Sequence, residues 1–181
     1  MANRCTIAYH EAGHAVVARL LNAQVNFVVM FATDATTKSV VQTRSEAYYA
    51  NSGSGEQVTG FEKDIKIKLA GSLAQKIARR GTAGREDDLA QAKNMALSIA
   101  MLRAGLELPP PGVRATVTVD TSILDEAQTI LNTLREETKA LLTENWPAVE
   151  RMAQALMERD LLDQDDLDRL INDAPVPKHT V

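Results

Sequence analysis

The sequence has one cysteine and no cluster of basic residues, and each absence excludes a class of protein. Cys5 stands alone among 181 residues, so an internal disulfide cannot form and a reducing compartment is favoured. The formal net charge is −4, with lysine and arginine scattered along the chain. Nucleic acid is therefore not expected as a partner, because binding to phosphates needs a basic face.

Long apolar runs are also absent. The strongest run, residues 25–32, has the length of a strand and falls short of the roughly 18 apolar residues that a membrane-spanning helix needs. The N-terminus lacks the apolar core of a secretory signal peptide. We therefore expect a soluble, cytoplasmic chain without a membrane span.

The spacing of apolar and turn residues predicts a mainly α-helical fold with a small β element. Apolar residues and histidines recur at helical spacing over residues 6–22. Two β-rich runs follow, joined by TDATT, which predicts a hairpin over 25–43. Further helices are expected over 61–80, 87–105, 121–144, 147–157 and 160–173. The segments expected between them as loops or extended links are 44–60, 81–84 and 109–119.

The first predicted helix carries two histidines around a glutamate, in AYHEAGHAVVA at residues 8–18. Residues four apart on a helix lie one turn apart, so the rings of His10 and His14 can reach one metal ion. Glu11 falls just off that line, where it can take a proton from an activated water without binding the metal. The pattern favours a zinc site with a built-in general base. The alternative is an amphipathic helix whose histidines lie at the surface, because HExxH also arises by chance.

Gly13 lies inside the same predicted helix. A glycine there costs roughly 0.5–1 kcal/mol relative to alanine, so its presence predicts that another element packs closely against this helix.

A catalytic zinc site needs a third protein ligand, because water takes the fourth position. The remaining histidine, His179, lies in the C-terminal tail, so carboxylates are the better candidates. The acidic cluster Glu86, Asp87 and Asp88 opens a predicted helix. Its alternative role is to complement the dipole of that helix.

Three segments, in the same order, resemble the peptidase domain of FtsH-type ATP-dependent zinc metalloproteases. AYHEAGHAVVA is similar to the metal helix of that family. Residues 69–96 are similar to a helix that ends at glycine and is followed by a Gly-x-x-Asn-Asp-Leu helix start. Residues 119–171 resemble the C-terminal helices of the family, and the resemblance covers most of residues 5–172.

The resemblance implies roles for individual residues. His10 and His14 match the histidine ligands of Zn²⁺, and Glu11 matches the catalytic base. Asp88 matches the aspartate that supplies the third ligand, and Asp87 stands where the family usually has asparagine. The implied fold is mainly α, with a zincin-like metal helix, a small β-hairpin or sheet near the N-terminus and a C-terminal helical bundle.

The same resemblance gives the expected domain organisation. Residues 1–174 are assigned to a single FtsH-like peptidase domain, and 175–181 to a flexible tail. Within the domain, the metal helix and β element occupy 5–43, the second and third helices 61–105, and the C-terminal helices 121–172.

The chain also departs from the family pattern. Ser72 and Gln75 stand where the family usually has arginine and glutamate, and the segment 105–120 is short and rich in proline. No GxxxxGK[ST] nucleotide-binding motif is present, and neither is a membrane anchor. The chain is therefore expected to be either an excised peptidase domain or a free-standing relative, and Met1 directly before the metal helix favours the second.

The expected function is that of a zinc-dependent metalloendopeptidase that hydrolyses peptides or unfolded proteins. A polypeptide is the expected substrate, and a separate ATPase or unfoldase and a homo-oligomer are the partners left open. The alternative is a catalytically silent metal-binding or interaction domain derived from the same family.

Overall fold

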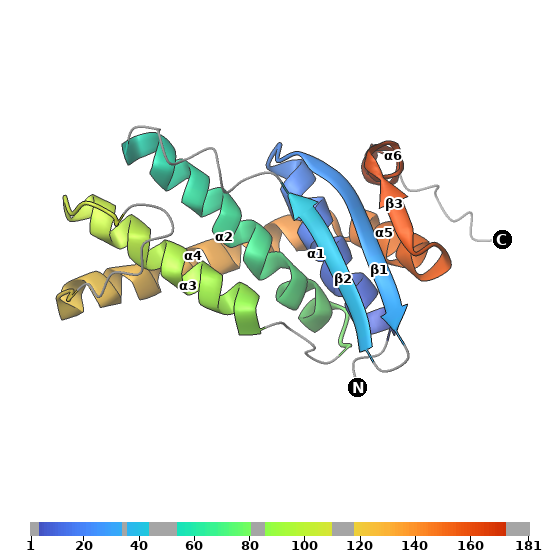
Figure 1. Ribbon diagram of the computed structural model, residues 1–181, viewed down its shortest axis with the longest axis horizontal. Coiled ribbons are helices and arrows are strands. Elements are labelled where there is room, and N and C mark those ends of the chain that lie inside the picture. The colour runs from blue at the N-terminus through green and yellow to red at the C-terminus, as the bar shows by residue number, and fades with distance from the viewer. Residues whose placement is uncertain (1–3, 34–35, 44–53, 81–85, 110–117, 173–181) are drawn as a thin grey trace.

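The computed structural model describes residues 4–33, 36–43, 54–80, 86–109 and 118–172 (Figure 1). Six helices and three strands follow one another in the described residues. Their order is α1 (Arg4–Leu20), β1 (Val25–Thr33), β2 (Thr36–Thr43), α2 (Ser54–Ile77), α3 (Glu86–Arg103), α4 (Thr121–Glu144), α5 (Trp146–Glu158), β3 (Leu161–Asp163) and α6 (Gln164–Asn172). The mainly α fold expected from the sequence is confirmed.

Helix α1 is the central element of the fold. It packs against α2 and α5, and the hairpin β1–β2 lies along it (Figure 1). From Thr6 to Ala18 every side chain except that of Tyr9 is buried. Small residues such as Ala8, Ala12 and Ala15 leave room for neighbours to approach on several sides, so the helix can be covered nearly all round. The histidines of this helix consequently lie inside the protein.

Helix α2 packs on α1 at the predicted glycine. A Cβ atom built on Gly13 would lie 2.7 Å from the Ala70 carbonyl oxygen and 2.7 Å from the Ala74 Cβ. These separations are shorter than any normal van der Waals contact, so only glycine allows this approach. The expected close contact at Gly13 is confirmed, and it brings the two backbones near the histidine pair.

Replacing Gly13 with alanine is expected to destabilise the fold by about 1–3 kcal/mol, because the added methyl meets the backbone of α2. The better helix propensity of alanine offsets only about 0.5–1 kcal/mol of this cost. Urea denaturation measures the change in the free energy of unfolding. Gly55→Ala, on α2, is the matched control, since nothing lies within 4 Å of a Cβ built there. Unchanged stability of Gly13→Ala would contradict the tight packing of α1 on α2.

The hairpin expected over 25–43 is confirmed, and the chain adds a third strand to it. The strand order is β2-β1-β3, with both pairings antiparallel. In β3 the pattern of exposure alternates, and the fully buried Leu162 pairs with Val28. The prediction of one helix over 160–173 was therefore wrong at its start. A three-residue strand is too short to produce a recognisable alternation, and only its pairing with β1 defines it.

Two further boundaries differ from the prediction. Helix α2 begins at Ser54, so the expected loop over 44–60 is wrong from residue 54 onward. Val58, Phe61 and Ile65 lie three and four residues apart and contact the core, which extends the helix over the Ser- and Gly-rich start. Helix α2 ends at Ile77, three residues before the predicted end at residue 80. Helix α4 has the predicted bounds, 121–144. Residues 44–53, 81–84, 110–117 and the tail 175–181, which carry other loop and tail predictions, lie outside the described residues.

One hydrophobic core draws residues from all six helices and from β1 and β3. The assignment of residues 1–174 to a single peptidase domain stays a prediction. No helix within the described ranges is both long and apolar enough to cross a membrane.

Candidate metal centre

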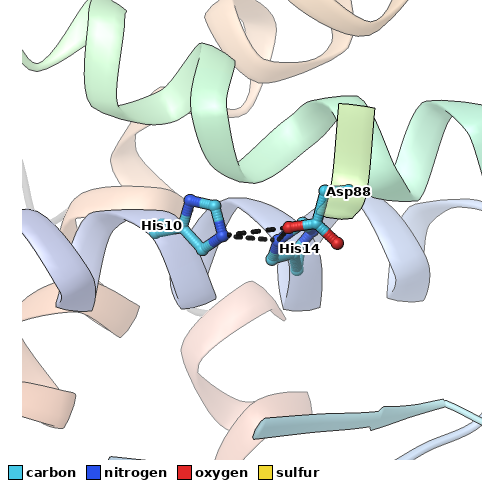
Figure 2. A group of neighbouring side chains, drawn as sticks. All are labelled: His10, His14 and Asp88. Atoms are coloured by element: carbon cyan, nitrogen blue, oxygen red, sulfur yellow. Dashed lines mark hydrogen bonds and ion pairs between the residues drawn. The ribbon is translucent and has the colours of Figure 1, made fainter. Parts of the chain in front are cut away.

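Three predicted site residues converge in the structure (Figure 2). His10 and His14 project from α1, and Asp88 comes from the first turn of α3. The two histidine Nε2 atoms are 3.0 Å apart, and the Asp88 Oδ2 lies 3.3 Å from one and 3.4 Å from the other. The chain thus brings two nitrogens and one carboxylate oxygen together from segments more than 70 positions apart.

These three atoms fit one zinc ion. Bond lengths of about 2.0–2.1 Å in a tetrahedral site place neighbouring ligand atoms about 3.3–3.4 Å apart. The observed separations of 3.0, 3.3 and 3.4 Å are close to that spacing. Two histidines with one carboxylate also form a donor set that catalytic zinc sites use. The site can therefore hold Zn²⁺ with one coordination position left for water or substrate.

Helix α2 orients the second histidine. The Nδ1 atom of His14 lies 2.6 Å from the carbonyl oxygen of Ile67. A carbonyl only accepts hydrogen bonds, so Nδ1 carries the proton and donates it. In the neutral ring the lone pair therefore lies on Nε2, the atom near Asp88. This contact fixes the ring in the tautomer that a metal ion requires.

Gly71 of α2 makes room for both rings. A Cβ atom built on it would lie 2.5 Å from the His14 Nε2 and 2.7 Å from the Cε1 and Nδ1 atoms of His10. The two rings are nearly perpendicular, with centroids 4.5 Å apart. Any side chain at Gly71 would displace at least one ring from this arrangement.

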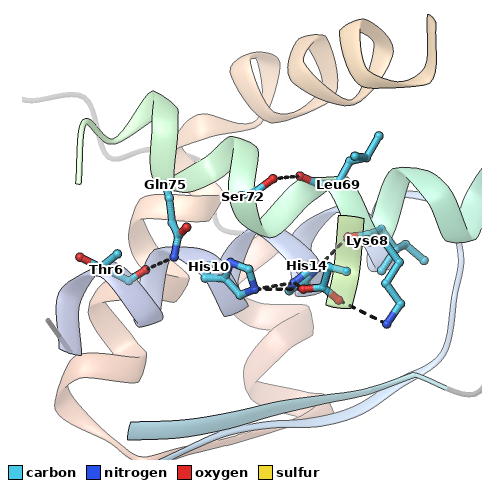
Figure 3. Close-up of polar contacts among 9 residues, drawn as sticks. Thr6, His10, His14, Lys68, Leu69, Ser72 and Gln75 are labelled. Atoms are coloured by element: carbon cyan, nitrogen blue, oxygen red, sulfur yellow. Dashed lines mark hydrogen bonds and ion pairs between the residues drawn. The ribbon is translucent and has the colours of Figure 1, made fainter. Parts of the chain in front are cut away.

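Charge at the site favours an ionised aspartate. Burial alone would raise the pKa of the Asp88 carboxyl, but hydrogen bonds from His10 and His14 and the charge of Lys68 hold it well below its usual range. The Lys68 Nζ lies 3.5 Å from the second oxygen of Asp88, Oδ1, and its side chain is about one-third exposed (Figure 3). Asp88 therefore offers Oδ2 to the centre while Lys68 holds Oδ1.

The His14 ring responds to the same charges. Burial lowers the pKa of His14, but the hydrogen bond to Asp88 and the negative charges of Glu11 and Asp88 outweigh it and raise the pKa above its ordinary value. Protons and a metal ion therefore compete for this ring, and metal binding is favoured as the pH rises.

The other candidates fall in different places. Glu11 is buried beside the pair, with 3% of its surface exposed. Asp87 is exposed and lies outside the cluster, while nothing is described of the Glu86 side chain. Ser72 bonds the carbonyl of Leu69 in its own helix (Figure 3). His179 lies outside the described residues.

The prediction from sequence missed Ile67, Lys68 and Gly71, all on α2. The sequence does indicate Gly71, because a glycine inside a predicted helix lowers the stability of that helix, as it does at Gly13. For the other two no local pattern points to the site, because their roles depend on how α2 faces α1.

No protein-family model matches the chain. It is 25% identical to the ATP-dependent zinc metalloprotease FtsH 4 of Sorangium cellulosum, over 96% of the chain and 30% of that protein. It is 29% identical to FtsH of Burkholderia pseudomallei, over 97% of the chain and 29% of that protein. The mitochondrial inner membrane m-AAA protease component AFG3L2 of the mouse is 27% identical, over 94% of the chain and 22% of that protein.

The chain thus spans at most about 30% of the length of these curated relatives. The three segments that suggested the resemblance lie within the matched region, which includes nearly the whole chain. Over almost its full length, the chain is a homologue of FtsH-type zinc metalloproteases.

Proposed function

We propose that the chain is a zinc-dependent metalloendopeptidase that hydrolyses peptide bonds in peptides or unfolded proteins. The observation that carries the proposal is the meeting of three ligand atoms within 3.4 Å of one another, one residue away from a buried glutamate. Zn²⁺ is the expected metal, because the two FtsH relatives are named as zinc metalloproteases. A site with three protein ligands and a buried carboxylate beside them suits hydrolysis, whereas a structural zinc site is closed by four protein ligands.

In this proposal His10, His14 and Asp88 hold Zn²⁺. The metal would supply Lewis acidity, which polarises the scissile carbonyl and makes the attacking water more acidic. Glu11 accepts the proton of that water and then delivers it to the leaving amine, so the carboxylate is regenerated. Lys68 holds Oδ1 of Asp88 and keeps the other oxygen turned to the metal.

The substrate is proposed to bind as an extended chain along the sheet. β2 is the outer strand of the order β2-β1-β3, and it contacts α1, which carries both histidines (Figure 1). In the described residues one edge of β2 has no neighbouring strand. Backbone hydrogen bonds along such an edge bind a polypeptide with little preference for its side chains.

Partners are part of the proposal. The relatives named FtsH are ATP-dependent, and this chain covers about 30% of their length. We propose that the chain itself acts on peptides and unfolded chains, with an ATPase supplying folded substrates and with self-association as a further option.

Zinc dependence of cleavage tests the proposal. The purified chain is expected to bind about one zinc ion, as the single-site geometry requires, and to cleave unfolded casein. Removal of the metal with a chelator is expected to abolish cleavage, and added Zn²⁺ but not Mg²⁺ should restore it. Zinc content is measured by atomic absorption and cleavage by release of a fluorescent label.

His14→Ala is the control for the metal, and it should lose both zinc and cleavage. If the zinc-loaded chain leaves casein and short peptides intact, the endopeptidase proposal fails. The catalytically silent metal-binding domain then becomes the better reading of the same site.

A further inference from the structure

Two buried polar atoms beside the metal centre have no hydrogen-bond partner among the described residues. They are the Nδ1 atom of His10 and the Oε1 atom of Gln75. Gln75 is fully buried, and 4% of His10 is exposed. One atom can donate and the other can accept, so each could satisfy the other. Buried polar groups are rarely left unpaired in this way.

The packing of α2 on α1 places the two residues near each other. The Gln75 Nε2 donates to the carbonyl oxygen of Thr6 at 3.1 Å, and Thr6 lies one helical turn before His10. Because that carbonyl can only accept, the nitrogen and oxygen of the amide are assigned unambiguously. Gly71 lies one turn before Gln75, and a Cβ on it would lie 2.7 Å from the His10 Nδ1. The His10 Nδ1 therefore faces bare backbone of α2, one turn from the Gln75 amide (Figure 3).

His14 shows what the same helix does for the other ligand. Its Nδ1 donates to the Ile67 carbonyl, which leaves Nε2 for the metal. Three residues of α2, spaced four apart, each face one residue of α1. Ile67 faces His14, Gly71 faces His10, and Gln75 faces Thr6. An acceptor for His10 would complete the pattern, and Gln75 carries the carbonyl oxygen that can fill this role.

We propose that Gln75 is a positioning residue of the metal centre, whose Oε1 accepts a hydrogen bond from Nδ1–H of His10 when the metal is bound. The proposal rests on the zinc site proposed above. The amide holds His10 in the tautomer that presents Nε2 to the metal, while its nitrogen keeps the bond to Thr6. Because the amide is neutral, it polarises the imidazole less than a carboxylate would at the same position.

Two variants separate this role from a purely structural one. Gln75→Leu removes both the acceptor and the donor. Gln75→Glu keeps an acceptor, now charged, but loses the donor to Thr6. Gln128→Leu, at an exposed glutamine of α4, is the control for the substitution itself. Zinc affinity is measured by competition with a chelator, and His10 Nδ1–H is followed by nitrogen-15 NMR of the zinc-bound protein.

Gln75→Leu is expected to weaken zinc binding by about 10–100-fold, the usual effect of losing a group that orients a ligand. In wild type the His10 Nδ1–H should exchange slowly with water, and in Gln75→Leu it should exchange rapidly. Gln75→Glu should bind zinc at least as tightly as wild type, while its metal-free form loses thermal stability. Gln128→Leu should match wild type.

A rapidly exchanging Nδ1–H in the zinc-bound wild type overturns the proposal without any variant. Equal zinc affinity in Gln75→Leu and wild type overturns it too, as does a Gln75→Glu protein that binds zinc as poorly as Gln75→Leu. These outcomes differ from failure of the proposed function. A chain that binds zinc without cleaving casein loses only the peptidase proposal, whereas one that binds no zinc loses both.

Discussion

Gly71→Ala is expected to weaken zinc binding by about 100-fold or more, beyond the usual effect of losing a single supporting contact. The added methyl would lie 2.5 Å from the His14 Nε2, the atom that faces Asp88, and 2.7 Å from two atoms of the His10 ring. Both rings or the helix must move. Ligand atoms in a working site have to stay within about 0.5 Å of their positions, so either movement disrupts the centre.

The His14 ring has little freedom to retreat from Gly71. Its Nδ1 is held 2.6 Å from the Ile67 carbonyl, and 7% of the residue is exposed. A movement of α2 instead would disturb the contact at Gly13, where the two backbones already touch. The gain in helix propensity, about 1 kcal/mol, is small beside the loss of two ligand positions.

Isothermal titration with zinc measures the effect, and circular dichroism checks that the variant is folded. Gly55→Ala is again the control, because it makes the same substitution in the same helix with open space around it. It should bind zinc as wild type does. A folded Gly71→Ala protein with wild-type affinity would show that the metal does not bind between these two rings.

The histidine pair could be predicted from the sequence because its geometry is local. A spacing of four residues on a helix places two side chains on one face, whatever the rest of the chain does. Gly13 likewise indicated a close neighbour, because a glycine inside a helix lowers the stability of that helix. It did not indicate which helix the neighbour is. Both features follow from the regular period of α1 alone.

The rest of the centre depends on contacts between distant segments. Only the resemblance to the FtsH family distinguishes Asp88 from the two acidic residues before it, because the start of a helix does not determine which carboxylate turns inward. Gln75 was recognised as a departure from the family, but its contact with Thr6 follows from the register between α1 and α2. The same holds for Lys68 and for strand β3, which exists only through its pairing with β1.

Glu11→Gln is expected to lower the rate of casein cleavage by about 10²–10⁴-fold, the usual contribution of a general base. Glutamine has nearly the same shape as glutamate but cannot accept the proton of the attacking water. Glu11 is not one of the three residues whose atoms converge, so the variant should keep its zinc. Its loss is therefore expected in kcat rather than in metal content.

Asp87→Asn gives a matched control for this result. It also replaces a carboxylate by its amide next to a proposed ligand, but Asp87 is exposed and lies outside the cluster. Its cleavage rate should stay within a few-fold of wild type. Equal rates in Glu11→Gln and wild type, with zinc present in both, would remove Glu11 as the base. Since no other carboxylate lies on α1, the base would then have to come from another element of the chain.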